Sequence, residues 1–222
     1  MNPVFKRVAT GLSVGAVVIA AILLAPPCAI MAVMAALCAL AFLEFGVLLS
    51  RKVSPREKGL KFAAALLVGC AVIGCGLWAL PTIALRHGNM MLLYIVAIVK
   101  FSDVGGFAFG LTTAKLMKGG NHKMCPTISP GKSWEGLAGS FVFSCIVSCS
   151  FIPATHFSVA KAIAFGVAAA VLGTAGDLVE SKFKRWVGVK DSSALKITNG
   201  LGGILDMLDS LIFAPAILMG AI

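Results

Sequence analysis

The chain has 222 residues, of which 59% are hydrophobic and only 13% are charged, and its mean hydropathy is +0.98. Soluble domains carry roughly 45–50% apolar and about 25% charged residues, so a soluble protein of this composition would expose large apolar patches. The composition all but excludes a soluble globular domain, a disordered chain and a nucleic-acid-binding domain, despite a formal net charge of +10.

Long apolar runs predict transmembrane helices, because a helix needs about 20 apolar residues to cross a bilayer. The first run follows two basic residues, as in a signal peptide, but Pro26 and Pro27 make a poor cleavage site, so we expect a retained span. In chain order, seven spans are predicted, at residues 8–25, 28–49, 60–80, 90–110, 136–154, 159–176 and 201–222. The expected fold class is all-α, a polytopic transmembrane helical bundle.

The basic residues indicate how these spans cross the membrane. Sixteen of the 19 lysines and arginines lie before the first span or in the loops 50–61, 111–135 and 177–200. Since positively charged loops stay in the cytoplasm, we predict a cytoplasmic amino terminus and cytoplasmic loops at 111–135 and 177–200. This arrangement suits a bacterial inner membrane. The charge suits anionic headgroups or a polyanionic substrate rather than nucleic acid.

Carboxylates in the second half of the chain are the candidate catalytic or metal-binding groups. Asp206 and Asp209 lie three residues apart in the last apolar run, so they share a helix face. Neighbouring carboxylates repel each other unless a proton or a cation lies between them, and a hard divalent metal ion is such a cation. Asp177 directly follows the sixth span, so the topology lets all three aspartates meet in a polar cleft open to the cytoplasm. Basic side chains follow closely, at Lys182, Lys184, Arg185 and Lys190.

Two further segments carry polar groups. Lys100 and Asp103 lie one turn apart in the fourth span and form either a helix-packing ion pair or part of the polar site. Residues 131–133 read Gly-Lys-Ser but form no P-loop, because Pro126 stands where the first glycine belongs. We interpret this segment as a rigid Pro/Gly turn that presents Lys132 and nearby hydroxyls to a phosphate. The alternative is a solvated loop.

Carboxylates that can bind a metal ion, together with basic side chains that can bind phosphates, are typical of phosphoryl or nucleotidyl transfer. Most of these groups lie in residues 90–222, which we define as a C-terminal catalytic region with the two cytoplasmic loops. Residues 1–89 form an N-terminal region of three transmembrane helices. Glycines of the fourth span are expected to permit close helix packing, at Gly105, Gly106 and Gly110.

Two segments carry long composite motifs. The first reads SDVGGFAFG at 102–110 and ISPGKSWEG at 128–136, and the second reads GDLVESKFKR at 176–185, VKD at 189–191 and GGILDMLDS at 202–210. These segments resemble the phosphatidate cytidylyltransferase family, also called CDP-diacylglycerol synthases. The family patterns are close to D-x-x-A/G-Y/F-x-x-G, S-P-x-K-[ST]-x-E-G, G-D-x-x-E-S-x-x-K-R, V-K-D and H-G-G-x-x-D-R-x-D-S. The resemblance covers residues 95–215, about half of the chain.

The sequence departs from the family pattern at two polar positions. Leu201 stands where the family has a histidine, and Met207 stands where it has an arginine. The stretch 192–200 also lacks the Pro-Gly that the family usually has there. These changes remove two polar groups near the phosphates. Every acid of the pattern is present, so we expect a working enzyme.

The resemblance implies that CTP and phosphatidic acid give CDP-diacylglycerol and pyrophosphate, with Mg²⁺ as cofactor and room for a second cation. It implies that Asp177, Asp206 and Asp209 form the metal site, with Lys190 and Asp191 as further catalytic residues. Substrate-binding roles are implied for Asp103, Ser129, Lys132, Ser133, Ser181, Lys184 and Arg185. The implied partners are CTP and phosphatidic acid in the bilayer, and the resemblance is compatible with a homodimer.

Three other functions stay open at this point. A CTP-dependent lipid-alcohol kinase would use the same nucleotide but transfer its γ-phosphoryl group, and the changes at Leu201 and Met207 leave room for it. A membrane transporter would line its path with the intramembrane charges, but we find no inverted repeat between the halves. The third alternative is an inactive relative with a scaffolding role.

Overall fold

The structure is a computed structural model that describes residues 15–53, 59–189 and 203–222. Most of these residues are helical. The elements, in chain order, are a helix at Gly15–Leu24, α2 (Pro27–Lys52), α3 (Gly59–His87), α4 (Asn89–Leu116), β1 (Lys123–Cys125), β2 (Ser129–Ser133), α5 (Trp134–Ser150), α6 (Ile152–Thr155), α7 (Val159–Val187), α8 (Ile204–Leu218) and a 3-10 helix at Met219–Ala221.

Five helices are long and apolar enough to cross a membrane, namely α2, α3, α4, α7 and the stretch Ile204–Ala221 that begins with α8. This confirms a helical, polytopic, integral membrane protein. The other two predicted spans fall on shorter apolar helices, Gly15–Leu24 and α5. Helix α5 has 17 residues and ends at Ser150, because the chain turns there into the short helix α6.

The structure corrects the sequence prediction between α4 and α5. Part of the predicted loop 111–135 is a two-stranded antiparallel hairpin, in which Lys123 pairs with Ser133 and Cys125 with Ser129. Lys132 therefore lies on strand β2 rather than in a turn. The fold class is thus the predicted all-α polytopic bundle, with one small two-stranded sheet between α4 and α5.

A second correction concerns the predicted loop 177–200. Helix α7 continues through Asp177 and ends only at Val187, where Gly188 adopts a left-handed conformation with φ of 89°. Glu180 and Lys184 lie one turn apart on this helical extension and form an ion pair, which supports the helix after the apolar run ends. The acidic and basic residues of this segment therefore lie on a rigid element.

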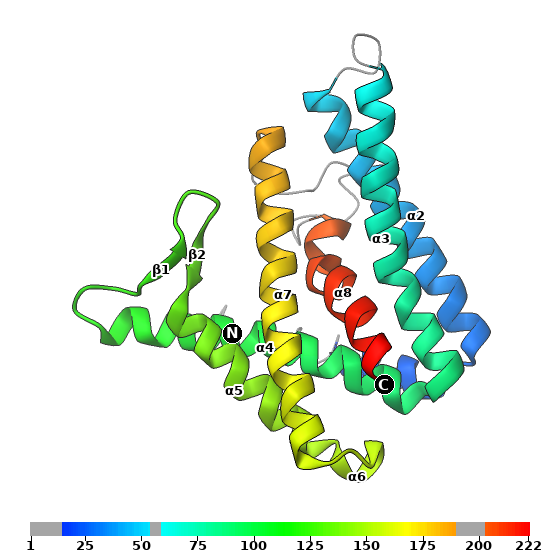
Figure 1. The fold of residues 1–222 in the computed structure, drawn as a ribbon, viewed down its shortest axis with the longest axis vertical. Helices are drawn as coiled ribbons and strands as arrows, with labels where there is room; N and C mark the ends of the chain where they lie inside the picture. Colours follow the sequence, from blue (N-terminus) through cyan, green and yellow to red (C-terminus); the bar gives the residue numbers. More distant parts are fainter. Residues whose placement is uncertain (1–14, 54–58, 190–202) are drawn as a thin grey trace, which may run out of the picture.

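Figure 1 shows how the helices are arranged. Helices α2 and α3 run side by side, α8 lies between α3 and α7, and α4 crosses below the upright helices and leads into the hairpin. The most deeply buried large side chains come mainly from α2, α3 and α4, among them Leu48, Leu77, Ile83, Tyr94 and Ile98. Helix α8 packs against α2, α3, α4 and α7, so helices from both halves of the chain surround it.

Helices α4 and α5 approach each other so closely that their backbones touch. A Cβ atom added at Gly105 would lie 2.5 Å from the carbonyl oxygen of Gly139, and one at Gly139 would lie 2.5 Å from that of Gly105. This confirms the prediction that glycines of the fourth span permit close helix packing. The contact fixes the beginning of α5, and with it the hairpin, against α4.

Candidate active site

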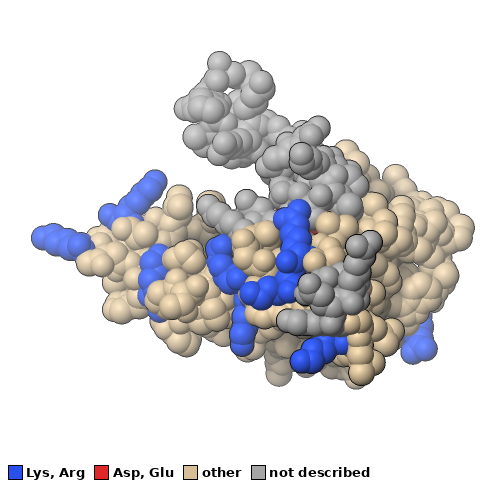
Figure 2. Space-filling view, turned by 90° about the horizontal axis from the view of Figure 1, so that it is seen from above, with Lys and Arg blue, Asp and Glu red and all other residues tan. Residues whose placement is uncertain are grey.

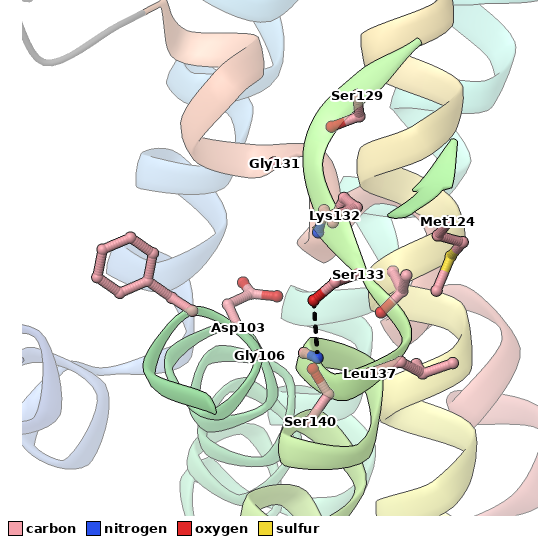
Figure 3. Close-up of a pocket in the computed structure, with 12 residues that line it drawn as sticks. Asp103, Gly106, Met124, Ser129, Gly131, Lys132, Ser133, Leu137 and Ser140 are labelled. Carbon is pink, nitrogen blue, oxygen red and sulfur yellow. Dashed lines mark hydrogen bonds between the residues drawn. The ribbon is translucent and has the colours of Figure 1, made fainter. Parts of the chain in front are cut away.

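A cavity of about 230 Å³ opens between α4, the hairpin, the beginning of α5 and α7. Figure 3 shows Asp103, Lys132 and Ser133 around it, with Met124 and Leu137 on another side. The polar side chains of its lining are Asp103, Ser129, Lys132, Ser133, Ser140 and Thr174. Four of the seven predicted substrate-binding residues therefore line one cavity, namely Asp103, Ser129, Lys132 and Ser133.

The hairpin that carries Lys132 is fixed at its base by hydrogen bonds. Asn121 Nδ2 donates to the carbonyl oxygen of Gly110 at 2.6 Å and to Ser133 Oγ at 3.2 Å. Ser133 Oγ also accepts from the backbone N–H of Gly136 at 3.1 Å, which caps α5 (Figure 3). Strand β2 is therefore held against both α4 and α5.

Glu135 also holds the base of the hairpin in place, through His122. Its Oε1 accepts from the backbone N–H of His122 at 3.1 Å and lies 2.6 Å from His122 Nδ1. The hydrogen bond from the His122 side chain, followed by that from its backbone, lowers the pKa of Glu135 to about 2. Glu135 is thus an anion that orients the hairpin, and it lies next to the cavity rather than in its lining.

A first group of charges lies beside the cavity, where α4, α7 and α8 meet. Lys132 pairs with Asp177 Oδ2, and Lys100 Nζ lies 3.6 Å from Asp103 Oδ2. Asp177 interacts in turn with the carboxyls of Asp103 and Asp209. Three carboxyls and two ammonium groups from four elements thus form one cluster, and Lys100 and Asp103 form an ion pair that is itself part of this polar cluster.

A second group of charges lies further along α7. Lys184 Nζ is 2.6 Å from both Glu180 Oε2 and Asp206 Oδ1, and the Lys184 side chain is only 14% exposed. Asp206 Oδ2 also accepts from the backbone N–H of Gly203 at 3.0 Å. Asp206 is therefore held in an ion-paired group with Lys184 and Glu180, while Asp177 and Asp209 face each other in the first cluster.

The remaining predicted site residues lie outside both groups. Arg185 donates from Nε to the carbonyl oxygen of Ile128 at 3.3 Å, which ties the end of α7 to the hairpin. Ser181 is partly buried on α7 and does not line the cavity. Lys190 and Asp191, like Leu201, lie outside the described residues. Met207 is about half exposed, and its carbonyl oxygen accepts from Lys100 Nζ at 3.2 Å.

Glu44 on α2 lies outside the motifs of the sequence. The structure buries its side chain completely and places it against α8, where its Oε2 accepts from the backbone N–H of Leu205 at 2.9 Å. Its one sequence signal is a carboxylate in an apolar run. Thr174 and Ser140 are two further polar lining residues that no motif pointed to.

The described residues hold no group of three or more His, Cys, Asp or Glu side chains arranged as a ready metal site. Three buried carboxylate oxygens nevertheless have no hydrogen-bond partner there: Glu135 Oε2 at the base of the hairpin, and Asp177 Oδ1 and Glu180 Oε1 in the two charged groups. In the two groups together, five carboxyls face three lysines. More carboxyls than lysines, with a free buried oxygen, require a proton or a cation between the carboxyls, and a divalent cation fits this arrangement.

The fold and the site define a class of protein: an integral membrane protein with a phosphate-suited cavity next to clustered carboxylates. The family model described as "Cytidylyltransferase family" matches residues 45–222, and the chain belongs to this family.

Three relatives show how far the similarity extends. Phosphatidate cytidylyltransferase of Haemophilus influenzae is 39% identical over 134 residues, which are 56% of this chain and 43% of the relative. Phosphatidate cytidylyltransferase of Staphylococcus aureus is 39% identical over 158 residues, 70% of this chain and 57% of the relative. Uncharacterized protein YnbB of Escherichia coli is 34% identical over 139 residues, 62% of this chain and 44% of the relative. The chain spans about half the length of the curated relatives it matches.

Proposed function

We propose that the protein transfers the cytidylyl group of CTP to phosphatidic acid and so makes CDP-diacylglycerol and pyrophosphate. The observation that carries this proposal is the position of Lys132, in a cavity wall and paired with Asp177 of the carboxylate cluster. The names of the Haemophilus and Staphylococcus relatives support the same reaction.

In this reaction an oxygen of the lipid phosphate attacks the α-phosphorus of CTP. The new P–O bond forms as the bond from the α-phosphorus to the bridging oxygen breaks, and pyrophosphate leaves. The lipid phosphate is already ionised at neutral pH, so no general base is required. The protein's task is to position two anions and to reduce their repulsion, which is the usual requirement of phosphoryl-type transfer.

The cavity lining suits this task. Lys132 supplies a positive charge for phosphate oxygens, and the hydroxyls of Ser129 and Ser133 supply hydrogen bonds. Phe107 of α4 is an apolar lining residue, and its side chain is 71% exposed. We propose that the lipid headgroup enters beside Phe107 while the acyl chains remain in the bilayer.

We propose Mg²⁺ as the cofactor, held by Asp177 and Asp209, with Asp206 contributing to a second cation site. The unpartnered Asp177 Oδ1 and the excess of carboxyls support the assignment. Magnesium held by these carboxylates would supply positive charge that offsets the negative charge of the phosphates during transfer. Lys100 and Lys132 would keep the carboxyls in place. The catalytic roles of Lys190 and Asp191 and the substrate-binding roles of Ser181, Lys184 and Arg185 also stay proposals from the family resemblance.

We further propose a bacterial inner membrane, a cytoplasmic amino terminus and seven spans. In Figure 2, the end of the molecule seen from above carries many lysines and arginines and almost no visible acid. Arg51 and Lys52 end α2, and Lys184 and Arg185 end α7. Since basic segments stay in the cytoplasm, this supports a cytoplasmic placement of that end. A homodimer stays a prediction.

The test uses purified protein in detergent with phosphatidic acid, Mg²⁺ and CTP labelled separately at the α and γ phosphates. We expect the α label to enter the lipid, and we expect a chelator or the Asp177→Asn substitution to abolish this transfer. Transfer of the γ label instead would replace the proposal by a lipid kinase. Transfer of neither label would overturn it.

A further inference from the structure

Glu44 is the one acidic side chain in the described part of the N-terminal region, residues 15–53 and 59–89, and it lies far from the motifs in sequence. Its side chain on α2 is only 1% exposed. Its carboxylate accepts a hydrogen bond of 2.9 Å from the backbone N–H of Leu205, 161 residues later. A buried acid at this depth requires a compensating partner, and here a partner is the amino-terminal turn of α8.

The contact has a clear physical basis. The first N–H groups of a helix have no partner within the helix, and the helix dipole makes this end attractive to an anion. No side chain caps α8 at its N-cap residue, which is Gly203. Glu44 therefore satisfies one of the free donors of α8 from a different helix and anchors that end of α8 to α2.

The anchored helix carries two acids of the site. Asp206 is the residue after Leu205, and Asp209 follows one turn later on the same helix. Two other contacts hold the same half of α8 from other directions: Lys184 of α7 pairs with Asp206, and Lys100 of α4 donates to Ser210 Oγ at 3.0 Å. Glu44 is the contact from the α2 side, so three helices together determine where these carboxyls lie.

We infer that Glu44 is a positioning residue, which sets the depth of α8 and thereby the placement of Asp206 and Asp209 for the transfer. This inference rests on the proposed function, because those two acids matter only if they serve the reaction. Small displacements matter in such a site, since a shift of about 1 Å can reduce a rate about a hundredfold.

The test compares Glu44→Leu, Glu44→Gln and the control Leu48→Ala. The glutamine keeps an oxygen that can accept from the Leu205 N–H, whereas leucine does not. Leu48 is also fully buried and lies one turn further along α2. The control therefore removes apolar packing from the same helix without touching the hydrogen bond. Each variant is purified in detergent and measured per folded protein.

Two readouts are combined. Hydrogen exchange reports whether the amino-terminal turn of α8 is still held, and it requires neither substrate nor activity. Steady-state kinetics at varied CTP and Mg²⁺ report whether the acids are still placed. For Glu44→Leu we expect faster exchange at residues 203–209, kcat reduced about tenfold to a hundredfold, a nearly unchanged KM for CTP, and a higher Mg²⁺ requirement. We expect Glu44→Gln to recover most of the activity and Leu48→Ala to keep both properties.

Normal exchange in Glu44→Leu would overturn the inference, because the α8 end would not depend on Glu44. Faster exchange with unchanged kcat and Mg²⁺ requirement would also overturn it and leave Glu44 a purely structural cap. An equal loss in Leu48→Ala would assign the effect to packing and likewise overturn it. A wild-type protein that transfers no label would overturn the proposed function instead. The hydrogen exchange data would still show whether Glu44 holds the end of α8, so the two failures can be told apart.

Discussion

Lys132 belongs to a sequence motif, lines the cavity and pairs with Asp177 of the carboxylate cluster. We predict that Lys132→Met reduces kcat about a hundredfold or more, since removing one donor to a developing charge costs about 10²–10³ in rate. Lys123 on the neighbouring strand is exposed and outside the cavity lining, so Lys123→Met is a matched control that should stay within about twofold. Label transfer from α-labelled CTP measures both. Equal losses would show that general hairpin charge, and not Lys132, binds the phosphates.

Glu135 gives a prediction for the dependence of stability on pH. Its pKa is lowered from 4.5 to about 2, so it binds fewer protons in the folded state than in the unfolded state. Its contribution to stability is then fully present above about pH 5 and disappears as the pH falls toward 2. We expect Glu135→Gln to have a lower Tm than wild type at pH 7, and this Tm difference to be clearly smaller at pH 3, because it vanishes only when the pH reaches the folded pKa of about 2. A Tm difference that is the same at both pH values would contradict this account.

Part of the site could be predicted from single residues. The chain has only nine acids, so Asp103, Asp177 and Asp209 stood out, and Lys132 stood out by its place in a motif. The structure brings these four residues together. The partners could not be predicted in the same way. The pairing of Lys184 with Asp206 depends on how far α7 extends, and the role of Glu44 depends on a contact across 161 residues.

Close backbone packing against α3, in addition to the ion pairs, determines the position of α8. A Cβ atom at Gly76 of α3 would lie 2.0 Å from the carbonyl oxygen of Ile212, so the two backbones are in contact there. We predict that Gly76→Ala displaces α8, lowers stability by about 1–3 kcal/mol as overpacking usually does, and reduces turnover. Gly59→Ala on the same helix meets nothing within 4 Å and serves as the control. Thermal unfolding in detergent and label transfer check both effects, and an unchanged Tm in Gly76→Ala would refute the contact.

The elements themselves were predictable where hydropathy alone decides them. The predicted spans 28–49, 60–80 and 90–110 fall on α2, α3 and α4, and the last two spans fall on α7 and α8. The end of α7 was predicted too early, because charged residues ended the apolar run although a Glu180–Lys184 pair continues the helix. The hairpin was missed because its strands have only three and five residues and are held by Asn121 and Glu135 at the base.

At the scale of the whole molecule, the site and the basic surface lie toward the same end. The hairpin and the carboxyl-terminal end of α7 point to the end that Figure 2 views, and Lys and Arg side chains gather there. Under the proposed function, a polar cavity at this end would allow a soluble nucleotide and a lipid headgroup to meet, while the acyl chains stay among the apolar helices. The same basic charges would then favour the proposed orientation and attract the anionic substrates.

This orientation can be tested with a cysteine that the chain already has. Cys125 lies on the hairpin, whereas the other six cysteines lie on the apolar helices α2, α3 and α5. If the hairpin is cytoplasmic, a membrane-impermeant thiol reagent should modify Cys125 in inverted membrane vesicles but not in intact cells. Cys125→Ser should lose this labelling and identify any background from the helical thiols. Labelling of Cys125 in intact cells would place the hairpin and the cavity on the outer face, where CTP is absent, and would contradict both the orientation and the proposed reaction.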